Sequence, residues 1–503
     1  MEMTMGSVSV LDYVVIGAFF ALIIGIGVYY GRKTKSMAQY FGAGKQIPWW
    51  LSGVSFYMLS FSAMAFVMHS ELAYKYGIVS FVLSWMAVPA AILSGLLFAR
   101  RWRRIADTSP LEYIETRYGI GMRQGLVWLG LPTRLLDNSL RLFAIGTVVS
   151  AGLGFSFSEA IFFCILIVWG YTFMGGLKAT IVADFVQFIL LMVGVIALPF
   201  FAFKVAGGLG ATLQALPPEF WKATRPDATP MAYPAVYLLC YFGMLFLNYS
   251  TSWSLAQRYY STKDDKGAVK IGLLVAALYL VGTPLFYLPG LAAHEILPGL
   301  ANTKEVYPLL CRTLLPVGML GLLIAVLLSA TISTLAGEFN AMSAVLTNDF
   351  YKRFIGKDTP EKRLLLIGRL GTVGIGAIIL CLTLLMRKLQ GANDLFDTMA
   401  KVFSLFLPPV AIPMLLGMLT PRVSATGAKL GLVVGIASGV TTFVLGGYFP
   451  EYNLRVVWVL LPTTITVTLL AILIGSLVKP DRGERRERVL QFFKKANGEV
   501  LKF

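Results

Sequence analysis

The chain has 503 residues, of which 57% are apolar and only 14% are charged. Soluble proteins carry about 25% charged residues, so this composition, with a mean hydropathy of +0.73, excludes a soluble enzyme, a disordered chain and a disulfide scaffold. We expect an all-α polytopic protein of the lipid bilayer. The net charge of +17 then concerns which side of the membrane holds Lys and Arg, and it does not indicate a nucleic-acid partner.

Apolar runs separated by polar breaks predict about 13 transmembrane helices, each of about 20 residues. In chain order they cover residues 10–31, 48–71, 77–99, 124–153, 156–174, 179–206, 232–254, 269–292, 315–348, 364–386, 394–419, 426–448 and 455–478. The first run is too long for a signal peptide and its basic residues follow it, so we expect it to be retained as a helix. The segment 207–230 is rich in Gly, Pro and Ala, which predicts a short surface helix or lid.

Lys and Arg are distributed unequally between the two sets of connections. Most of the 43 lie on alternate connections, including the cluster at 100–104, and in the tail at 479–503. The positive-inside rule then predicts a plasma (inner) membrane protein with its N-terminus outside and its C-terminus in the cytoplasm. The tail mixes basic residues with apolar ones, and two placements stay open for it, on the inner leaflet or in solvent.

Two predicted spans carry hydroxyl side chains, which the hydrocarbon region tolerates where they face protein or a cavity. They are Ser52, Ser55, Ser60 and Ser62 in the second span, and Ser329, Thr331, Ser333 and Thr334 in the ninth. Ser333 and Thr334 can offer two oxygens to a small hard cation if an unwound helix nearby supplies carbonyls. The alternative is that the hydroxyls bond carbonyls of their own helix and pack between helices.

Ionisable residues within the predicted spans are a second signal, because charges inside a membrane are costly. Arg134, Asp137 and Arg141 share one face of the fourth span. Asp137 can neutralise one arginine, so Arg141 could receive a substrate carboxylate through its planar fork of donors. A purely structural ion pair is the alternative. Asp184, in the sixth span, either caps a helix or assists a cation site.

The segment 330–354, ATISTLAGEFNAMSAVLTNDFYKRF, resembles the signature of the sodium:solute symporters, whose members carry sugars, proline, pantothenate, iodide, monocarboxylates and sialic acids. Further matching positions follow in order along the chain. They are Phe41, Gly44, Trp49, Trp50, Thr108, Pro110, Glu112, Tyr113, Arg117, Tyr118, Gly119, Gly175, Gly176, Asp184, Gln187, Gln257, Arg258, Leu288, Pro289 and Gly290. The resemblance implies a LeuT-type fold with two five-helix inverted repeats. We expect these repeats at 48–206 and 232–419, with an extra helix at 1–31, two C-terminal helices at 426–478 and a basic cytoplasmic tail at 479–503.

The resemblance also implies a sodium site. Its five positions in this chain are the carbonyls of Phe56 and Leu59, together with Ala330, Ser333 and Thr334. Some sialic acid transporters bind another sodium through the aspartate that matches Asp184 and two hydroxyls, but Ala336 and Gly337 stand at those hydroxyl positions here. We therefore expect one coupled sodium, with Asp184 in an auxiliary role.

Substrate positions follow from the same resemblance. Ser60 and Arg141 match the residues that hold the substrate carboxylate in the sialic acid transporters, and Asn248 or Tyr249 matches the inner-gate tyrosine of the sugar carriers. Met58 and Tyr279 depart from the sugar-carrying branch. We expect a symporter, not an enzyme, that functions as a monomer and imports a small organic solute, with a carboxylate such as a sialic acid or sugar acid favoured over a glucose- or galactose-like sugar.

Two other classes of membrane protein, an ion channel and a sensor module, fit the sequence less well. An ion channel needs a continuous polar pore, whereas hydroxyls concentrated at two helix breaks favour an occluded site. A sensor module needs a signalling domain, and only about 25 residues follow the last span.

Overall fold

The computed structural model describes residues 9–34, 36–60, 63–106, 109–228, 232–300, 303–389 and 395–498. This part of the chain is helical, and its β structure is confined to two isolated bridges, Ile47 with Thr262 and Arg225 with Tyr233. The all-α prediction is therefore confirmed. Helices of the first half are α1 Val10–Lys33, α2 Met37–Gly42, α3 Trp49–Ser60, α4 Ala63–Tyr76, α5 Val79–Trp85, α6 Ala87–Ser94, α7 Arg100–Ile105, α8 Glu112–Tyr118, α9 Ile120–Leu153 and α10 Phe157–Val205.

The second half continues the same pattern of long helices joined by short connections. Its helices are α11 Leu209–Ala215, α12 Ala235–Thr251, α13 Trp253–Tyr260, α14 Asp265–Ile296, α15 Val306–Leu314, α16 Met319–Val345, α17 Lys352–Phe354, α18 Glu361–Leu389, α19 Leu395–Leu419, α20 Ala425–Tyr448, α21 Val457–Val478 and α22 Glu484–Asn497. Two π-helical turns, Gly95–Ala99 and Leu346–Tyr351, extend α6 into α7 and α16 into α17. The short α11 lies in the segment for which a surface helix was expected.

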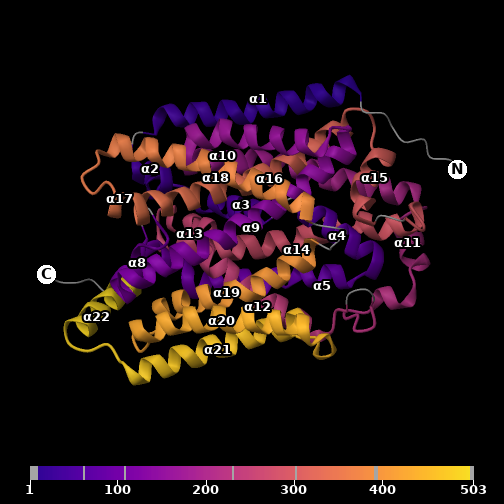
Figure 1. The fold of residues 1–503 in the computed structure, drawn as a ribbon. Helices are drawn as coiled ribbons and strands as arrows, with labels where there is room; N and C mark the ends of the chain where they lie inside the picture. Colours follow the sequence, from indigo (N-terminus) through magenta and orange to yellow (C-terminus); the bar gives the residue numbers. More distant parts are fainter. Residues whose placement is uncertain are drawn as a thin grey trace.

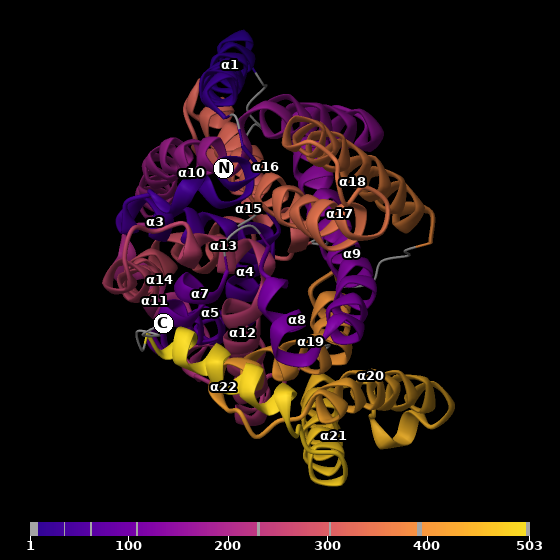
Figure 2. The same cartoon turned by 90° about the vertical axis from the view of Figure 1, so that its left-hand side faces the viewer.

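The long helices form one bundle around α16. Figure 1 shows α1 along one edge and α20 with α21 along the opposite edge, and the end-on view in Figure 2 shows the same separation. The start of α1 and the helix α22 lie at opposite ends of the bundle (Figure 1). In α16, 88% of the membrane-length window is buried, against 33% in α1 and in α21. The outer helices therefore present apolar side chains outwards, whereas α16 forms the centre.

Nine helices in the described residues are long and apolar enough to cross a membrane, and two shorter apolar helices, Phe157–Gly170 and Ala235–Thr251, accompany them. The count of 13 spans stays a prediction. The expected fifth and sixth spans are the two helical parts of α10, which meet at a kink at Gly176, where φ of 60° and ψ of −162° are not helical. A Cβ atom there would lie 2.7 Å from the carbonyl oxygen of Tyr40, so only glycine fits both the backbone angle and the space.

The structure describes the first helix of each expected repeat in two parts. The second predicted span contains α3 up to Ser60 and α4 from Ala63. The seventh is divided into α12 and α13 by Ser252, whose φ and ψ of −57° and 131° are not helical. Helix ends leave backbone carbonyl and N–H groups without partners in the helix. The break at Ser252 therefore brings polar backbone groups into the middle of the bundle.

The C-terminal tail forms α22, whose apolar face packs on the bundle. The buried side chains of this face are Val489, Phe492, Phe493 and Ala496. Both placements considered for these residues, the inner leaflet and free solvent, are therefore wrong. The ring of Phe492 stacks on Tyr113 of α8 at a centroid distance of 5.9 Å.

The arginine side chains around α22 bind it to the bundle as well. Arg104 donates from Nη1 to the carbonyl of Ala496 at 3.1 Å, and Arg485 donates to the carbonyl of Tyr118 at 2.6 Å. Arg117 of α8 is fully buried, and its burial lowers the pKa of the guanidinium, while Tyr118 and Asp481 oppose this shift. The apolar residues of the tail therefore pack on protein, which was neither of the two placements considered for them.

Candidate transport site

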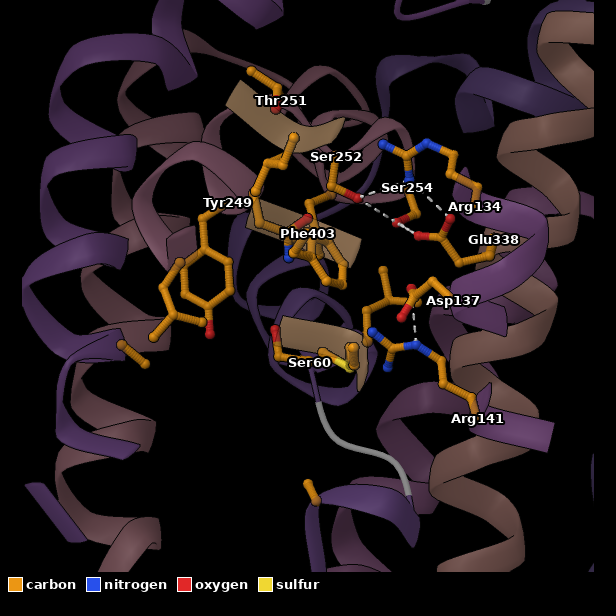
Figure 3. Close-up of a pocket in the computed structure, with 18 of the residues that line it drawn as sticks. Ser60, Arg134, Asp137, Arg141, Tyr249, Thr251, Ser252, Ser254, Glu338 and Phe403 are labelled. Carbon is orange, nitrogen blue, oxygen red and sulfur yellow. Dashed lines mark hydrogen bonds and ion pairs between the residues drawn. The ribbon is translucent and has the colours of Figure 1, made fainter. Parts of the chain in front are cut away.

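A cavity lies beside the last described turn of α3 and the break between α12 and α13, and it is shown in Figure 3. Helix α9 contributes the charged side chains, the end of α3 contributes Leu59 and Ser60, and α12 and α13 contribute groups on both sides of their break. Helix α19 contributes apolar side chains to the cavity, among them Phe403 and Phe406. The lining of the whole cavity also includes Ser60, Arg134, Asp137, Arg141, Asn248, Tyr249, Ser252, Ser254, Tyr279 and Glu338.

The charged face predicted on the fourth span is confirmed as a face of α9 that borders this cavity. Arg141 donates from Nε to Oδ2 of Asp137 at 3.1 Å. Arg134 instead pairs with Glu338 of α16, its Nη1 lying 3.0 Å from Oε2. The guanidinium of Arg134 also lies 4.6 Å from the ring centroid of Trp253. Each arginine therefore has its own carboxylate, and Figure 3 shows both pairs on the same side of the cavity.

Glu338 is the functional candidate that the sequence reasoning missed. It follows the hydroxyl-rich turn of α16 by four residues and accepts hydrogen bonds from Arg134 and from Ser254 beside the second helix break. The sequence signal was an acid inside an otherwise apolar span. Its partner could not be identified, because Arg134 stands 204 positions earlier in the chain.

All four predicted substrate positions line the cavity. Ser60 stands at the last turn of α3 and bonds the carbonyl of Phe56 at 3.2 Å. Tyr249 donates its phenolic hydrogen to the hydroxyl of Tyr279 at 2.8 Å, and the adjacent Asn248 also borders the cavity. With Arg141, these side chains give a solute hydroxyl, amide and guanidinium partners. What each of them binds stays a prediction.

The predicted sodium positions lie beside the cavity, where the end of α3 meets α16. The hydroxyl oxygen of Thr334 is 3.5 Å from the carbonyl oxygen of Leu59 and 2.9 Å from that of Ala330. Ser333, one residue before, is fully buried, as is Phe56, whose carbonyl belongs to the last turn of α3. Carbonyls at a helix C-terminus carry partial negative charge and lack intrahelical partners.

This donor set fits a sodium ion. It consists of hydroxyl and carbonyl oxygens, which are the ligands that hard cations take. Thr334 also donates to the carbonyl of Ala330 in its own helix. This is the intrahelical hydrogen bond that the alternative interpretation of the hydroxyls predicts. Ser333 does not follow that alternative, because its hydroxyl donates to Asp184 of α10.

Asp184 is not a helix cap. It lies inside α10, eight positions after the kink, and its carboxylate accepts hydrogen bonds from Ser55 of α3 and Ser333 of α16. Nη2 of Arg258, from α13, lies 3.4 Å from its Oδ2. The carboxylate thus joins four helices around the predicted sodium positions, and the capping interpretation is wrong.

These features define a class of protein. Discontinuous helices that enclose a polar cavity in the middle of a membrane bundle are the structural basis of secondary transporters. A family model described as "Sodium:solute symporter family" matches residues 40–435. Because the match covers more than half of the chain, the protein belongs to the sodium:solute symporter family, and the resemblance seen in its sequence is confirmed.

Individual relatives agree with this assignment. The chain is 28% identical over 464 residues to a sodium/glucose cotransporter of Vibrio parahaemolyticus, covering 85% of this chain and 84% of the relative. It is 27% identical over 454 residues to the sodium/sialic acid symporter NanT of Aliivibrio fischeri, covering 86% and 87%. Among solved structures, a substrate-bound outward-open Na⁺-coupled sialic acid symporter superimposes with a TM-score of 0.82 at 20% identity, covering 94% of this chain and 98% of that one. This likeness supports the fold.

Proposed function

We propose that the protein imports a small organic carboxylate, such as a sialic acid or sugar acid, together with one sodium ion, by alternating access. Arg141 carries the proposal, because its guanidinium lines the cavity near Ser60 and can hold a carboxylate through two parallel hydrogen bonds. Sodium is proposed to bind the carbonyls of Phe56, Leu59 and Ala330 and the hydroxyls of Ser333 and Thr334. The protein is proposed to function as a monomer, with its N-terminus outside and its C-terminus in the cytoplasm of the plasma (inner) membrane.

The adjacency of the two proposed sites on α3 supports coupling between the two ligands. Leu59 is assigned to sodium and the adjacent Ser60 to the solute, so both ligands fix the same turn of backbone. A first ligand that orders this turn lowers the ordering cost for the second. By thermodynamic linkage, each ligand then raises the affinity for the other by the same factor.

A neutral sugar is the alternative solute, and one observation favours it. Arg141 and Arg134 already have carboxylate partners in Asp137 and Glu338, so these four side chains contribute no net charge to the cavity. A carboxylate must therefore share Arg141 with Asp137, whereas a glucose- or galactose-like solute adds no charge.

Uptake into proteoliposomes tests both versions of the function. The purified protein is supplied with an inward sodium gradient, or a matched choline gradient, and with a panel of sialic acids, sugar acids and uncharged hexoses. We expect saturable uptake of a carboxylate that requires sodium. Uptake of hexoses alone would show that the solute is a neutral sugar and not a carboxylate. Flux that neither saturates nor depends on sodium would refute symport and indicate a channel.

A further inference from the structure

A second hollow of the protein, here called the basic hollow, lies at the surface of the bundle where α3, α7 and α14 meet. Its lining consists of Trp49, Arg103, Lys263, Asp264, Asp265, Lys266, Gly267 and Lys270. None of these residues lines the transport cavity. Arg104, next to the hollow, contacts both Asp265 and the carbonyl of Ala496 in α22. The basic hollow therefore lies at the end of the bundle that holds α22, which is the end predicted to face the cytoplasm.

The two carboxylates of the basic hollow already have partners. Oδ1 of Asp264 accepts the backbone N–H of Gly267 at 2.6 Å and caps α14. Oδ2 of Asp265 lies 2.7 Å from Nη2 of Arg104. Within the described part of the chain, no ion pair involves the four cations of the lining, which are Arg103, Lys263, Lys266 and Lys270. The hollow therefore has an excess of positive charge that an anion can neutralise.

The backbone around the basic hollow is held by hydrogen bonds between separate segments. Arg103 of α7 donates from Nε to the carbonyl of Thr262 at 2.6 Å and from Nη2 to that of Lys263 at 2.9 Å. The N–H of Ile47, just before α3, donates to the carbonyl of Ser261 at 3.0 Å. These bonds fix the end of α7 and the starts of α3 and α14 relative to one another. Only the exposed lysine side chains need to adjust to a ligand.

The exposed face of α14 continues from the basic hollow as an apolar surface. Lys266, Lys270 and Leu273 follow one another at spacings of four and three residues and share one face of the helix. Leu273 is 46% exposed, and Leu280, two turns further along this membrane-length helix, is 55% exposed. Nζ of Lys270 lies 5.3 Å from the ring centroid of Trp49, and tryptophan is typical of the headgroup level of a membrane. One face of α14 therefore offers cations at the membrane boundary and apolar side chains beyond them.

We propose that the basic hollow binds the phosphate of an anionic phospholipid, whose acyl chains lie along the apolar face of α14. Lys266 and Lys270 contact the phosphate as point charges, which is how lysine binds phosphate. Basic pockets between membrane helices on the cytoplasmic side are suited to anionic headgroups. A zwitterionic lipid is a poorer ligand because its quaternary ammonium is repelled by the lysines. The site is separate from the proposed solute and sodium positions, so this inference does not depend on the transported solute.

Native mass spectrometry of the purified full-length protein counts bound lipids without requiring transport. The protein, in neutral detergent, is offered phosphatidylglycerol and phosphatidylcholine with identical acyl chains at equal concentrations, and we expect it to bind phosphatidylglycerol preferentially. The double variant Lys266→Gln with Lys270→Gln is expected to lower the affinity for phosphatidylglycerol at least about tenfold and to leave phosphatidylcholine binding unchanged. Lys263→Gln, which lies before the helix, is expected to lower it about fivefold. Lys266→Arg with Lys270→Arg keeps both charges and should retain most of the binding.

Two controls separate a built site from general attraction between charges. Lys357→Gln with Lys362→Gln removes two other exposed lysines, located between α17 and the first turn of α18. Figure 1 shows α17 and α22 at the same end of the bundle, so this variant loses the same charge on the same side, and we expect unchanged lipid binding. Soluble glycerol 3-phosphate is the second control because it offers the phosphate without acyl chains. We expect it not to compete at the concentration of the lipid.

Three results would overturn the lipid site. One is equal binding of the two lipids by the unaltered protein. Another is an equal loss of phosphatidylglycerol in the two glutamine double variants, because binding would then follow the net charge and not the basic hollow. Competition by glycerol 3-phosphate at the lipid concentration would assign the hollow to a soluble phosphate instead. The melting temperature without added lipid, which we expect to be unchanged, verifies that each variant is folded, and Lys263→Gln gives a reading that does not depend on α14.

Discussion

Two of the buried ion pairs of the bundle differ in what surrounds them. The side chains of Arg141 and Asp137 are 14% and 13% exposed and border the cavity, whereas those of Arg258 and Asp184 are 0% exposed. A pair that borders a cavity can exchange one partner for an incoming solute. A pair enclosed by protein has no such freedom, and it acts instead on the groups that it contacts. This difference agrees with the proposal that α9 recognises the solute, and that the enclosed pair acts on Ser333 among the proposed sodium ligands.

The largest expected effect is on the enclosed pair. Asp184→Asn leaves the buried charge of Arg258 without its carboxylate, and breaking such a pair costs about 3–5 kcal/mol. We expect a large fall in thermal stability or loss of folded protein. The double variant with Arg258→Gln should recover most of the loss. Asp137→Asn is the matched change in the cavity pair, and equal destabilisation by both asparagine variants would contradict the distinction between the pairs.

The next effect concerns the solute. Arg141→Lys keeps the positive charge but loses the planar fork of donors, so we expect at least about a tenfold loss of carboxylate affinity, or 1.4 kcal/mol. Stabilisation by sodium should persist. Arg134→Lys serves as the control, because that side chain is held by Glu338 and Trp253. Binding assays with the preferred solute compare the two, and an equal loss in both would remove the special role of Arg141.

The sodium ligands should show a smaller and more specific change. Ser333→Ala and Thr334→Ala each remove one oxygen, and we expect the sodium concentration for half-maximal stabilisation to rise about tenfold, near the lower end for disturbed metal sites. Thr331→Ala is the control on the same helix, since that hydroxyl bonds the carbonyl of Leu327 at 3.2 Å. The measurement is a thermal-shift titration with sodium. Unchanged sodium dependence in both alanine variants would refute the site.

The sequence predicted the fold and much of the site because those features are local. Hydropathy gave the helices, and the four-residue spacing placed Asp137 and Arg141 on one face of a helix. The contact of Thr334 with Leu59 agrees with the family resemblance. The pairing of Arg134 with Glu338, and of Asp184 with Arg258, depends on which helices cross in the bundle. No pattern within a single span contains that information.

The C-terminal helix α22 is a second case in which the pattern of one segment does not identify the segment that it contacts. Its mixture of basic and apolar residues indicated an amphipathic segment, but such a segment is equally suited to lipid and to protein. Arg117 and Tyr113 of α8 decide the outcome, because they meet Phe493 and Phe492 of α22. These residues are more than 370 positions apart in the chain.

The smallest expected effect concerns this docked helix. Phe492→Ala removes a buried ring that stacks on Tyr113, and because α22 lies at the edge of the bundle we expect a loss of about 0.5–1 kcal/mol, at the lower end of the range for single substitutions. The loss should be local, since α22 does not contribute to the cavity or to the sodium positions. Limited trypsin digestion should therefore cut the basic residues of α22 faster, while the sodium titration stays unchanged. Leu490→Ala is the control from the exposed face of the same helix, where the side chain is 44% exposed. Equal cleavage rates for the two variants would show that the apolar face does not hold α22 in place.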